Sequence, residues 1–351
     1  MKTLLGGNDA FFQGALRAGA NYFAGYPISP TTEILTLAAE RAEEQQDFHF
    51  LQAEDEIAAA IAVVSASLAG AKAFTATSGP GFSLMQEAIS WGYRVEAPTV
   101  FFESQRVGPS TGAPTFPAQE DILQAMHGAH GTYYPLAFYP NSPAECYTLA
   151  VTAFNAAEEA KQPVIFLCDG YVSHLYESVD LEALEIPPAV PRSRPPLGTG
   201  KRHFTGIAAD EEGIPRTGNP QVQEAWVKKV KERNEEVAKR YPLYEYKERD
   251  SDTLLISYGS TSRVTAPLQE RFSHFRPIRI FPVLKEELRK ACEKHERIVV
   301  LEANDGQYAM LVEHAIGREV EKIPLLGGKI SLSRIKEPLK DILGVELEDV
   351  L

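Results

Sequence analysis

The chain has 351 residues, 44% of them hydrophobic, and its net charge is −13. This length and composition predict a globular protein of about two domains, and the acidic balance argues against nucleic acid or an anionic membrane as the main partner. The longest nearly apolar run, residues 57–71, is shorter than the roughly 20 residues that cross a bilayer. Since the N-terminus also lacks a secretory signal pattern, we expect a soluble, cytoplasmic protein.

Strand-like and helix-like segments alternate from the N-terminus to about residue 185. The predicted strands are residues 2–5, 22–25, 48–51, 72–77, 99–103, 136–138 and 163–168. The predicted helices are residues 8–17, 30–44, 56–71, 82–93, 119–127 and 143–160. Strict alternation with short apolar strands predicts an α/β fold, a doubly wound parallel sheet with helices on both faces. Ligands bind such sheets at the carboxyl ends of the strands.

The second half of the chain differs in composition. Residues 186–251 begin with a proline-rich stretch and end in a charged helix over 222–239, so we interpret them as a connector. Residues 252–351 then return to α/β alternation. The strands predicted there are residues 253–258, 278–281, 297–302 and 321–325, and the helices are residues 263–272, 284–294 and 308–316. We expect a second, smaller α/β domain.

The three cysteines and eight histidines do not have the spacing of metal ligands. Cys146, Cys168 and Cys292 are far apart, and no CxxC pattern occurs. A thiolate-held metal or an iron–sulfur cluster within this chain alone is therefore not expected. No Walker loop or GxSxG motif is present, and the SGPG segment at 78–81 does not match GxGxxG, so nicotinamide binding is weakly supported.

Three carboxylates, Glu54, Asp55 and Glu56, precede a helix made almost wholly of small and apolar residues. A helix that is apolar on every side is buried, and Ala59 and Ala60 share a face with Glu56, which leaves room for a flat ring against the acid. We interpret Glu54 and Asp55 as acids that complement the helix dipole. Glu56 has no polar face to carry it to solvent, and an unpaired buried carboxylate is costly, so Glu56 is the candidate catalytic acid.

Two further features of the same sheet edge favour anions. Ser29 as N-cap with Pro30 at the first helical position predicts a helix N-terminus with free backbone N–H groups. Arg106 lies in a Gly/Pro-shaped loop, where its guanidinium can fork onto a carboxylate. Singly, Ser29 would be a plain cap and Arg106 a surface ion pair. Their convergence on one edge, together with residues 78–81, predicts a ligand site.

Six motifs, in this order along the chain, resemble the alpha subunits of 2-oxoacid:ferredoxin oxidoreductases, which are thiamine-diphosphate enzymes, and the 2-oxoglutarate type in particular. The motifs are YPISP at 26–30, EDE at 54–56, TSGPG at 77–81, RVGPSTGAPT at 106–115, DEEG at 210–213 and SYGST at 257–261. The resemblance covers about residues 5–330. It implies a pyrimidine-binding-type domain at 1–185, a connector at 186–251 and a transketolase C-terminal-like domain at 252–351.

The resemblance also implies roles for individual residues. Glu56 would bond the pyrimidine ring of thiamine diphosphate and favour its imino tautomer, with Glu54 as the alternative. Ser29, where the family usually has threonine, and Thr31 would contact the substrate, and Arg106 would bind the carboxylate of the 2-oxoacid. The other cofactor-binding residues implied are Tyr26, Pro27, Ile28, Ser78 and Gly79.

The reaction implied is the oxidative decarboxylation of a 2-oxoacid with coenzyme A, giving acyl-CoA and CO2, with the electrons passing to ferredoxin. The family holds Mg²⁺ and the diphosphate on a GDG motif with a later asparagine, but here Cys168 precedes Asp169 and Gly170, and no asparagine follows until Asn219. By resemblance, the Mg²⁺ site and the iron–sulfur cluster lie on a beta subunit, with a gamma-type subunit as a further partner. This chain would then supply half of a shared active site.

Three alternatives remain open from the residues. The chain could belong to a pyruvate or branched-chain 2-oxoacid oxidoreductase, because these share the motifs. A second alternative is a thiamine-diphosphate decarboxylase or ligase that transfers no electrons. The third is a binding or regulatory module without catalytic activity on the same fold.

Overall fold

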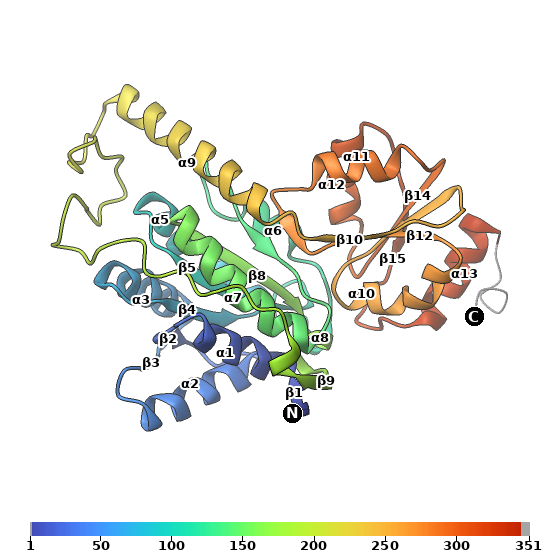
Figure 1. The fold of residues 1–351 in the computed structure, drawn as a ribbon, viewed down its shortest axis with the longest axis horizontal. Helices are drawn as coiled ribbons and strands as arrows, with labels where there is room; N and C mark the ends of the chain where they lie inside the picture. The colour runs from blue at the N-terminus through green and yellow to red at the C-terminus, as the bar shows by residue number, and fades with distance from the viewer. Residues whose placement is uncertain (1, 345–351) are drawn as a thin grey trace.

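The computed structural model describes residues 2–344, in which two sheets lie beside each other (Figure 1). The first has the order β13-β7-β8-β5-β4-β2-β3, with β6 paired to β5. Its strands are β2 (Tyr22–Gly25), β3 (His49–Gln52), β4 (Ala73–Thr77), β5 (Thr99–Val107), β6 (Ala113–Pro117), β7 (Ala137–Phe138), β8 (Pro163–Asp169) and β13 (Arg279–Phe281). All are parallel to their neighbours except β6 and β13. The predicted parallel α/β fold is therefore confirmed.

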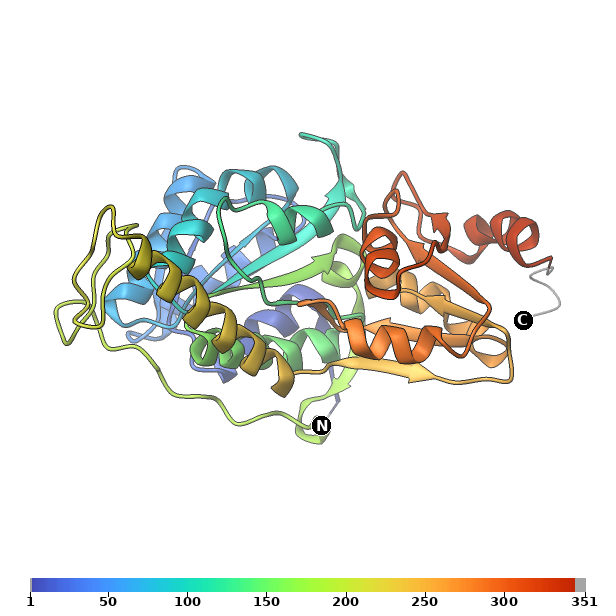
Figure 2. The same cartoon turned by 90° about the horizontal axis from the view of Figure 1, so that it is seen from above.

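Helices cover both faces of the first sheet (Figures 1 and 2). They are α1 (Gly7–Arg17), α2 (Thr32–Glu44), α3 (Glu56–Ala69), α4 (Gly79–Leu84), α5 (Gln86–Arg94), α6 (Ile122–His127), α7 (Pro143–Ala160) and α8 (Gly170–His174). Adjacent residues of β5 face opposite ways, as the strand period of two requires. Phe102 packs against Phe11 of α1, with ring centroids 4.4 Å apart, whereas Phe101 packs in the core that contains α3 and α5.

The second sheet has the order β10-β12-β11-β14-β15. Its elements are β10 (Tyr244–Lys247), β11 (Thr253–Ile256), α10 (Gly259–Val264), β12 (Ser273–Pro277), α11 (Lys285–Cys292), β14 (Arg297–Glu302), α12 (Gln307–Ile316), β15 (Glu321–Pro324) and α13 (Leu332–Leu343). The remaining elements are the antiparallel pair β1 (Lys2–Gly6) and β9 (Tyr176–Asp180), the 3-10 turns Leu181–Ala183 and Ala266–Glu270, and α9 (Pro220–Arg240).

One predicted strand of the second sheet lies elsewhere. The sequence places a strand at 278–281 in that sheet, but β12 ends at Pro277 and the chain then crosses to the first sheet, where β13 pairs antiparallel with β7. Proline has no N–H to continue the ladder beyond β12. The N–H groups of Ile278 and Arg279 instead donate to the carbonyl of Leu243, 3.0 and 2.9 Å away. The C-terminal part of the chain thus completes the edge of the first sheet.

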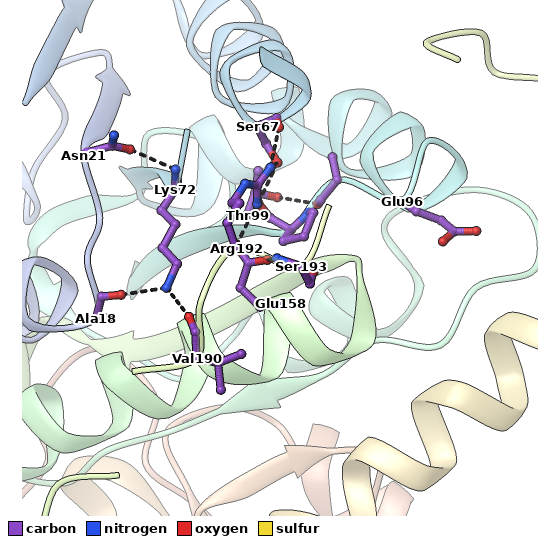
Figure 3. Close-up of polar contacts among 12 residues, drawn as sticks. Ala18, Asn21, Ser67, Lys72, Glu96, Thr99, Glu158, Val190, Arg192 and Ser193 are labelled. Atoms are coloured by element: carbon purple, nitrogen blue, oxygen red, sulfur yellow. Dashed lines mark hydrogen bonds and ion pairs between the residues drawn. The ribbon is translucent and has the colours of Figure 1, made fainter. Parts of the chain in front are cut away.

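Residues 186–219 run along the surface and are held by a few specific contacts (Figure 3). Lys72 donates to the backbone carbonyls of Ala18 and Val190. Arg192 pairs with Glu158 at 2.7 Å and also donates to the carbonyl of Ser67. The backbone N–H and hydroxyl of Ser193 each donate to Glu158 at 2.8 Å. The extended segment is therefore fixed to α3 and α7 by charge-assisted hydrogen bonds.

The pair between Arg192 and Glu158 gives a first prediction. Replacing Arg192 with methionine is expected to lower the free energy of unfolding by about 3 kcal/mol, because the carboxylate of Glu158 is buried and would lose its counter-ion. The matched control is Arg240→Met, since the exposed Arg240 pairs at 3.4 Å with the half-buried Glu159, which also accepts a hydrogen bond from Tyr241, and the change should alter stability by no more than about 1 kcal/mol. Urea unfolding measures both values, and equal effects would contradict the prediction.

Candidate functional site

Glu56 is the first residue of α3, at the carboxyl end of the first sheet. Asp55 caps this helix, accepting a hydrogen bond from the N–H of Ala58 at 2.7 Å. The side chain of Glu56 is buried, at 7% exposed, whereas Glu54 is exposed. Ala59 and Ala60, which follow at three and four places, are fully buried. The three adjacent acids therefore have different surroundings, and only Glu56 lies among small buried side chains.

The SGPG turn packs directly against Glu56. A Cβ atom on Gly81 would lie 2.6 Å from Oε1 of Glu56 and 2.2 Å from Oγ1 of Thr77, so glycine is required for this close approach. Ser78 is fully buried, and its hydroxyl has no partner among the described residues. The position of Gly79 faces Asp121, whose Oδ2 would lie 3.5 Å from a Cβ placed there. The turn thus forms one wall of the site.

Residues 26–31 form a turn and not the predicted start of a helix. The Ser29–Pro30 peptide bond is cis, and α2 begins at Thr32. The N–H and hydroxyl of Thr31 both donate to the carbonyl of Ile28, at 2.9 and 3.0 Å. Asn8 donates to the carbonyl of Pro30 at 2.8 Å. These contacts hold the backbone of the turn, and the prediction that Ser29 caps the helix is wrong.

Within this turn the predicted site residues differ in exposure. Tyr26, Pro27 and Ser29 are exposed, Ile28 is half-buried and Thr31 is buried. Ser29 is therefore open to solvent in the chain by itself, while the hydroxyl of Thr31 is held inside the turn.

Arg106 lies in a strand and not in the predicted loop. β5 continues to Val107, and Arg106 pairs with Pro117 of β6. Its Nη1 donates to the carbonyl of Ser29 at 2.7 Å, while its Nε is buried without a partner among the described residues. Burial lowers the pKa of Arg106, and the neighbouring carboxylates of Asp121 and Glu56 act in the opposite direction. The charges of Arg106 and Glu56 therefore act on each other at the carboxyl end of the first sheet.

A pair of acids that the sequence analysis did not single out lies beside Arg106. Glu103 on β5 is fully buried, its carboxylate oxygens have no partner among the described residues, and its charge is coupled to that of Asp121. The pKa of Glu103 is held well above its usual range, mainly by burial and then by the nearby charge of Asp121. Burial also raises the pKa of Asp121, to about 6. Two neighbouring buried carboxyl groups repel each other when both are ionised, so the pair holds a proton more tightly than either acid does in water. An acid at the end of an otherwise apolar strand was the signal in the sequence.

This acid pair gives a second prediction, for Glu103→Gln. The two acids bind protons more tightly in the folded chain than in the unfolded one, so their protonation stabilises the folded state. This contribution to the free energy of unfolding is complete below about pH 4. It is lost as the pH rises through the pKa of Asp121, about 6, and beyond. Glutamine keeps a donor to Asp121 but has no proton to lose. We expect the free energy of unfolding of the variant to depend less on pH between about 4 and 8.

Urea unfolding at several pH values measures this effect. Glu103→Leu is the contrasting variant, because it removes the polar neighbour of Asp121, whose Oδ2 is buried, and should lower the free energy of unfolding by about 1–3 kcal/mol. A glutamine variant whose stability depends on pH as steeply as that of the native chain would exclude the shared proton.

Asp169 links the two sheets. It is fully buried and caps α8, accepting from the N–H of Val172 at 3.0 Å, while its other oxygen accepts from the N–H of Ser260 at 2.8 Å. Gln119 adds a second link, donating to the carbonyl of Tyr258 at 2.9 Å. Burial raises the pKa of Asp169, against the hydrogen bonds from Ser260 and Val172. Asp169 thus has a structural role in this chain.

One face of α3 is open, although the sequence predicts burial on every side. Ile57 and Ile61 are 49% and 39% exposed, on the face next to Glu56. Leu84 of α4 and Leu51 of β3 are also exposed. The other faces of α3 pack on the sheet and on α5, so the helix is buried only in part. Large apolar side chains exposed beside a site indicate a surface that another molecule covers.

The residues of this site fit the pyrimidine half of thiamine diphosphate. Glu56 presents a buried carboxylate among alanines, and the unpartnered hydroxyl of Ser78 lies in the wall that packs on it.

Residues 2–344 contain no group of three or more acidic, histidine or cysteine side chains placed to hold a metal ion. In the same range, no helix is long and apolar enough to cross a membrane.

Comparison with known sequences gives a consistent result. The family model described as pyruvate flavodoxin/ferredoxin oxidoreductase, thiamine diphosphate-binding, matches residues 13–249. The 2-oxoglutarate synthase subunit KorA of Methanothermobacter marburgensis is 38% identical over 376 residues, covering 97% of this chain and 98% of that protein. KorA of Archaeoglobus fulgidus is 37% identical, with 98% and 99% covered. The ketoisovalerate oxidoreductase subunit VorB of M. marburgensis is 33% identical, with 96% and 97% covered.

Two solved structures resemble the chain. The first is a 2-oxoglutarate:ferredoxin oxidoreductase from Magnetococcus marinus with 2-oxoglutarate, coenzyme A and succinyl-CoA bound. It matches with a TM-score of 0.89 and 27% identity, over 97% of this chain and 65% of that longer chain. The second, a split gene transketolase, matches with a TM-score of 0.57 and 12% identity, over 99% of this chain and 95% of that one, which shows a shared fold alone.

Proposed function

Because this chain belongs to the pyruvate flavodoxin/ferredoxin oxidoreductase family, we propose that it is the alpha subunit of a 2-oxoglutarate:ferredoxin oxidoreductase. The complex would convert 2-oxoglutarate and coenzyme A to succinyl-CoA and CO2 and pass the electrons to ferredoxin. The choice of 2-oxoglutarate rests on sequence identity. Two 2-oxoglutarate synthase subunits are 38% and 37% identical to this chain over nearly the full length, whereas the ketoisovalerate oxidoreductase subunit is 33% identical. The observation that carries the catalytic role is the burial of the Glu56 carboxylate among the alanines of α3, with Gly81 packed directly against it.

Glu56 is the proposed catalytic residue. When bound, thiamine diphosphate supplies the carbon nucleophile that attacks the 2-oxo group. Glu56 would hold a proton at the pyrimidine ring, with Ala59 and Ala60 leaving space for the ring. Its burial supports this role, because a carboxylate away from water exchanges a proton with a bound group more readily than with solvent. The exposed Glu54 is the weaker candidate for the same contact.

Arg106 is the proposed substrate-binding residue. Its guanidinium has an unpartnered buried Nε, and its Nη1 already fixes the turn at Ser29. A forked bond to the substrate carboxylate would satisfy the free N–H. Ser29 and Thr31 lie on the same turn and are the proposed substrate contacts; the hydroxyl proton of Thr31 already goes to the carbonyl of Ile28, so Thr31 would accept a hydrogen bond, while Ser78 and Gly79 line the cofactor side.

A beta subunit is the proposed cover for the open face of α3. The exposed side chains of Ile57, Ile61 and Leu84 lie beside Glu56, so a partner bound there would also enclose the site. That partner would hold the diphosphate, Mg²⁺ and the iron–sulfur cluster. A gamma-type subunit and ferredoxin complete the proposed assembly, and coenzyme A is the second substrate.

The test is an anaerobic affinity purification of the tagged chain from its own cells. The eluate is assayed for coenzyme-A-dependent dye reduction with 2-oxoglutarate, pyruvate and 2-oxoisovalerate. We expect co-purified subunits, iron, thiamine and the highest activity with 2-oxoglutarate. A preference for another 2-oxoacid would change the substrate, and thiamine without iron would favour a non-redox decarboxylase. A chain purified alone and without activity would favour a binding module.

A further inference from the structure

A second candidate binding site lies at the opposite edge of the first sheet from Glu56. A cavity of about 550 Å³ opens between the turn that follows α5, the connector and the first turns of α9. Glu96 in its lining comes just before β5 begins, whereas Arg106 lies near the end of β5. Figure 1 shows these segments at the left end of the first sheet, away from the second sheet. This cavity is therefore separate from the proposed active site.

The cavity contains more cations than its acids can pair. Three basic side chains converge on the single carboxylate of Glu96: Arg194 at 3.5 Å, Lys229 at 3.3 Å and Arg233 at 2.9 Å. The lining has two further acids: Asp210 is already paired with Arg216 at 2.6 Å, and Glu211 is exposed. This cluster of positively charged side chains contrasts with the net charge of the whole chain, which is −13.

Two further arginines of the lining have no carboxylate partner among the described residues. Arg202 donates only to backbone carbonyls, of Pro195 at 2.7 Å and of Glu96 at 3.3 Å. Arg94 lies over the ring of Trp226, 3.9 Å from its centroid, and donates to the side-chain oxygen of Gln223 at 2.9 Å. Arg192 on the same connector is different, because Glu158 neutralises it (Figure 3). Of these two connector arginines, only Arg202, at the cavity, lacks a carboxylate partner among the described residues.

The crowding of these cations has an energetic cost. Burial, followed by the charges of Arg194 and Arg192, lowers the pKa of Arg202 to about 10. In the lining, the Nε atoms of Arg194 and Arg202 are buried without a partner among the described residues. A multiply charged anion would relieve this repulsion and accept the free N–H groups, since guanidinium geometry matches phosphate oxygens.

We propose that this cavity binds a phosphate-bearing anion, held by Arg94, Arg202 and Lys201. Side chains carry the recognition, because Asn219 already accepts the N–H groups of Gln221 and Val222 at the start of α9. The volume falls within the range of about 300–1,000 Å³ for small-molecule sites, so free phosphate and a nucleotide both fit. The proposal stands without the reaction proposed above.

The test is isothermal titration calorimetry on the purified complex that contains this chain, with inorganic phosphate and ADP as probes at constant ionic strength. We expect saturable binding with a dissociation constant of about 1 mM or below. Arg202→Gln should weaken it by at least about tenfold. Lys201→Gln, at an exposed position of the lining, should also weaken binding of the probes. This variant tests the site if Arg202→Gln does not fold. Lys228→Gln, on the outer face of α9, is the control and should bind as the native chain does.

The binding of ADP and of phosphate to the cavity distinguishes the possible ligands. Tighter binding of ADP than of phosphate, lost with Arg202→Gln, supports a nucleotide site, and equal binding of the two supports a site for free phosphate. Absence of saturable binding for both probes overturns the proposal. Binding that Arg202→Gln and Lys201→Gln leave unchanged also overturns it, because the anion then binds elsewhere in the complex.

Discussion

Replacing Glu56 with glutamine is expected to lower the turnover of the assembled complex by at least about a hundredfold, the usual effect of losing a proton-transfer group. Glutamine has nearly the same shape, so the packing against Gly81 and the alanines of α3 should persist and assembly should remain intact. The amide cannot take up or release the proton that a carboxyl group exchanges. Coenzyme-A-dependent dye reduction at saturating 2-oxoacid gives the turnover number.

The control for this variant is Glu54→Gln, two residues earlier. Glu54 is exposed, so its variant should keep near-normal turnover. Near-normal turnover in Glu56→Gln would reject the catalytic role of Glu56, and a large loss in Glu54→Gln alone would transfer that role to Glu54. Unchanged subunit composition on gel filtration separates a catalytic defect from a failure to assemble.

Replacing Arg106 with alanine is expected to weaken the apparent affinity for the 2-oxoacid by about 1.5–3 kcal/mol, as for the loss of a charge-assisted hydrogen bond. The Michaelis constant for the 2-oxoacid should rise by roughly 10- to 150-fold, while that for coenzyme A should change little. Initial rates over a range of 2-oxoacid concentrations measure the effect.

Arg106→Lys separates charge from geometry in this experiment. Lysine keeps the charge but cannot fork onto a carboxylate or reproduce the bond to Ser29, so its Michaelis constant should lie between those of the native enzyme and the alanine variant. An unchanged Michaelis constant in Arg106→Ala would contradict substrate binding by Arg106. An equal rise for both substrates would indicate that the turn at Ser29 has collapsed.

The sequence predicts the parallel core well because its signals are local. Apolar strands and the helices between them have their own periodicity, and this places Glu56 and Arg106 at one sheet edge. Features set by distant residues were not predictable in this way. The helix after Ser29 begins late because Asn8 and Thr31 hold the turn, and Arg106 lies in a strand because β6 pairs back onto β5.

The acid pair and the open face of α3 show two other limits. Glu103 and Asp121 are 18 positions apart, and only the fold brings them together, so no spacing rule identifies the pair. The exposed side chains of Ile57 and Ile61 look like core residues in sequence, because a helix made almost wholly of small and apolar residues does not show which of its faces stays open.

Because β13 crosses into the first sheet, we expect the two sheets to unfold together. A fragment that ended at the connector would lose β13 and leave β7 as an unpaired edge. It would also divide one hydrophobic core, which includes Phe101 and Ile165 on one side and Leu254 and Ile256 on the other. The chain should accordingly unfold as a single cooperative unit, with a calorimetric enthalpy equal to the van't Hoff enthalpy.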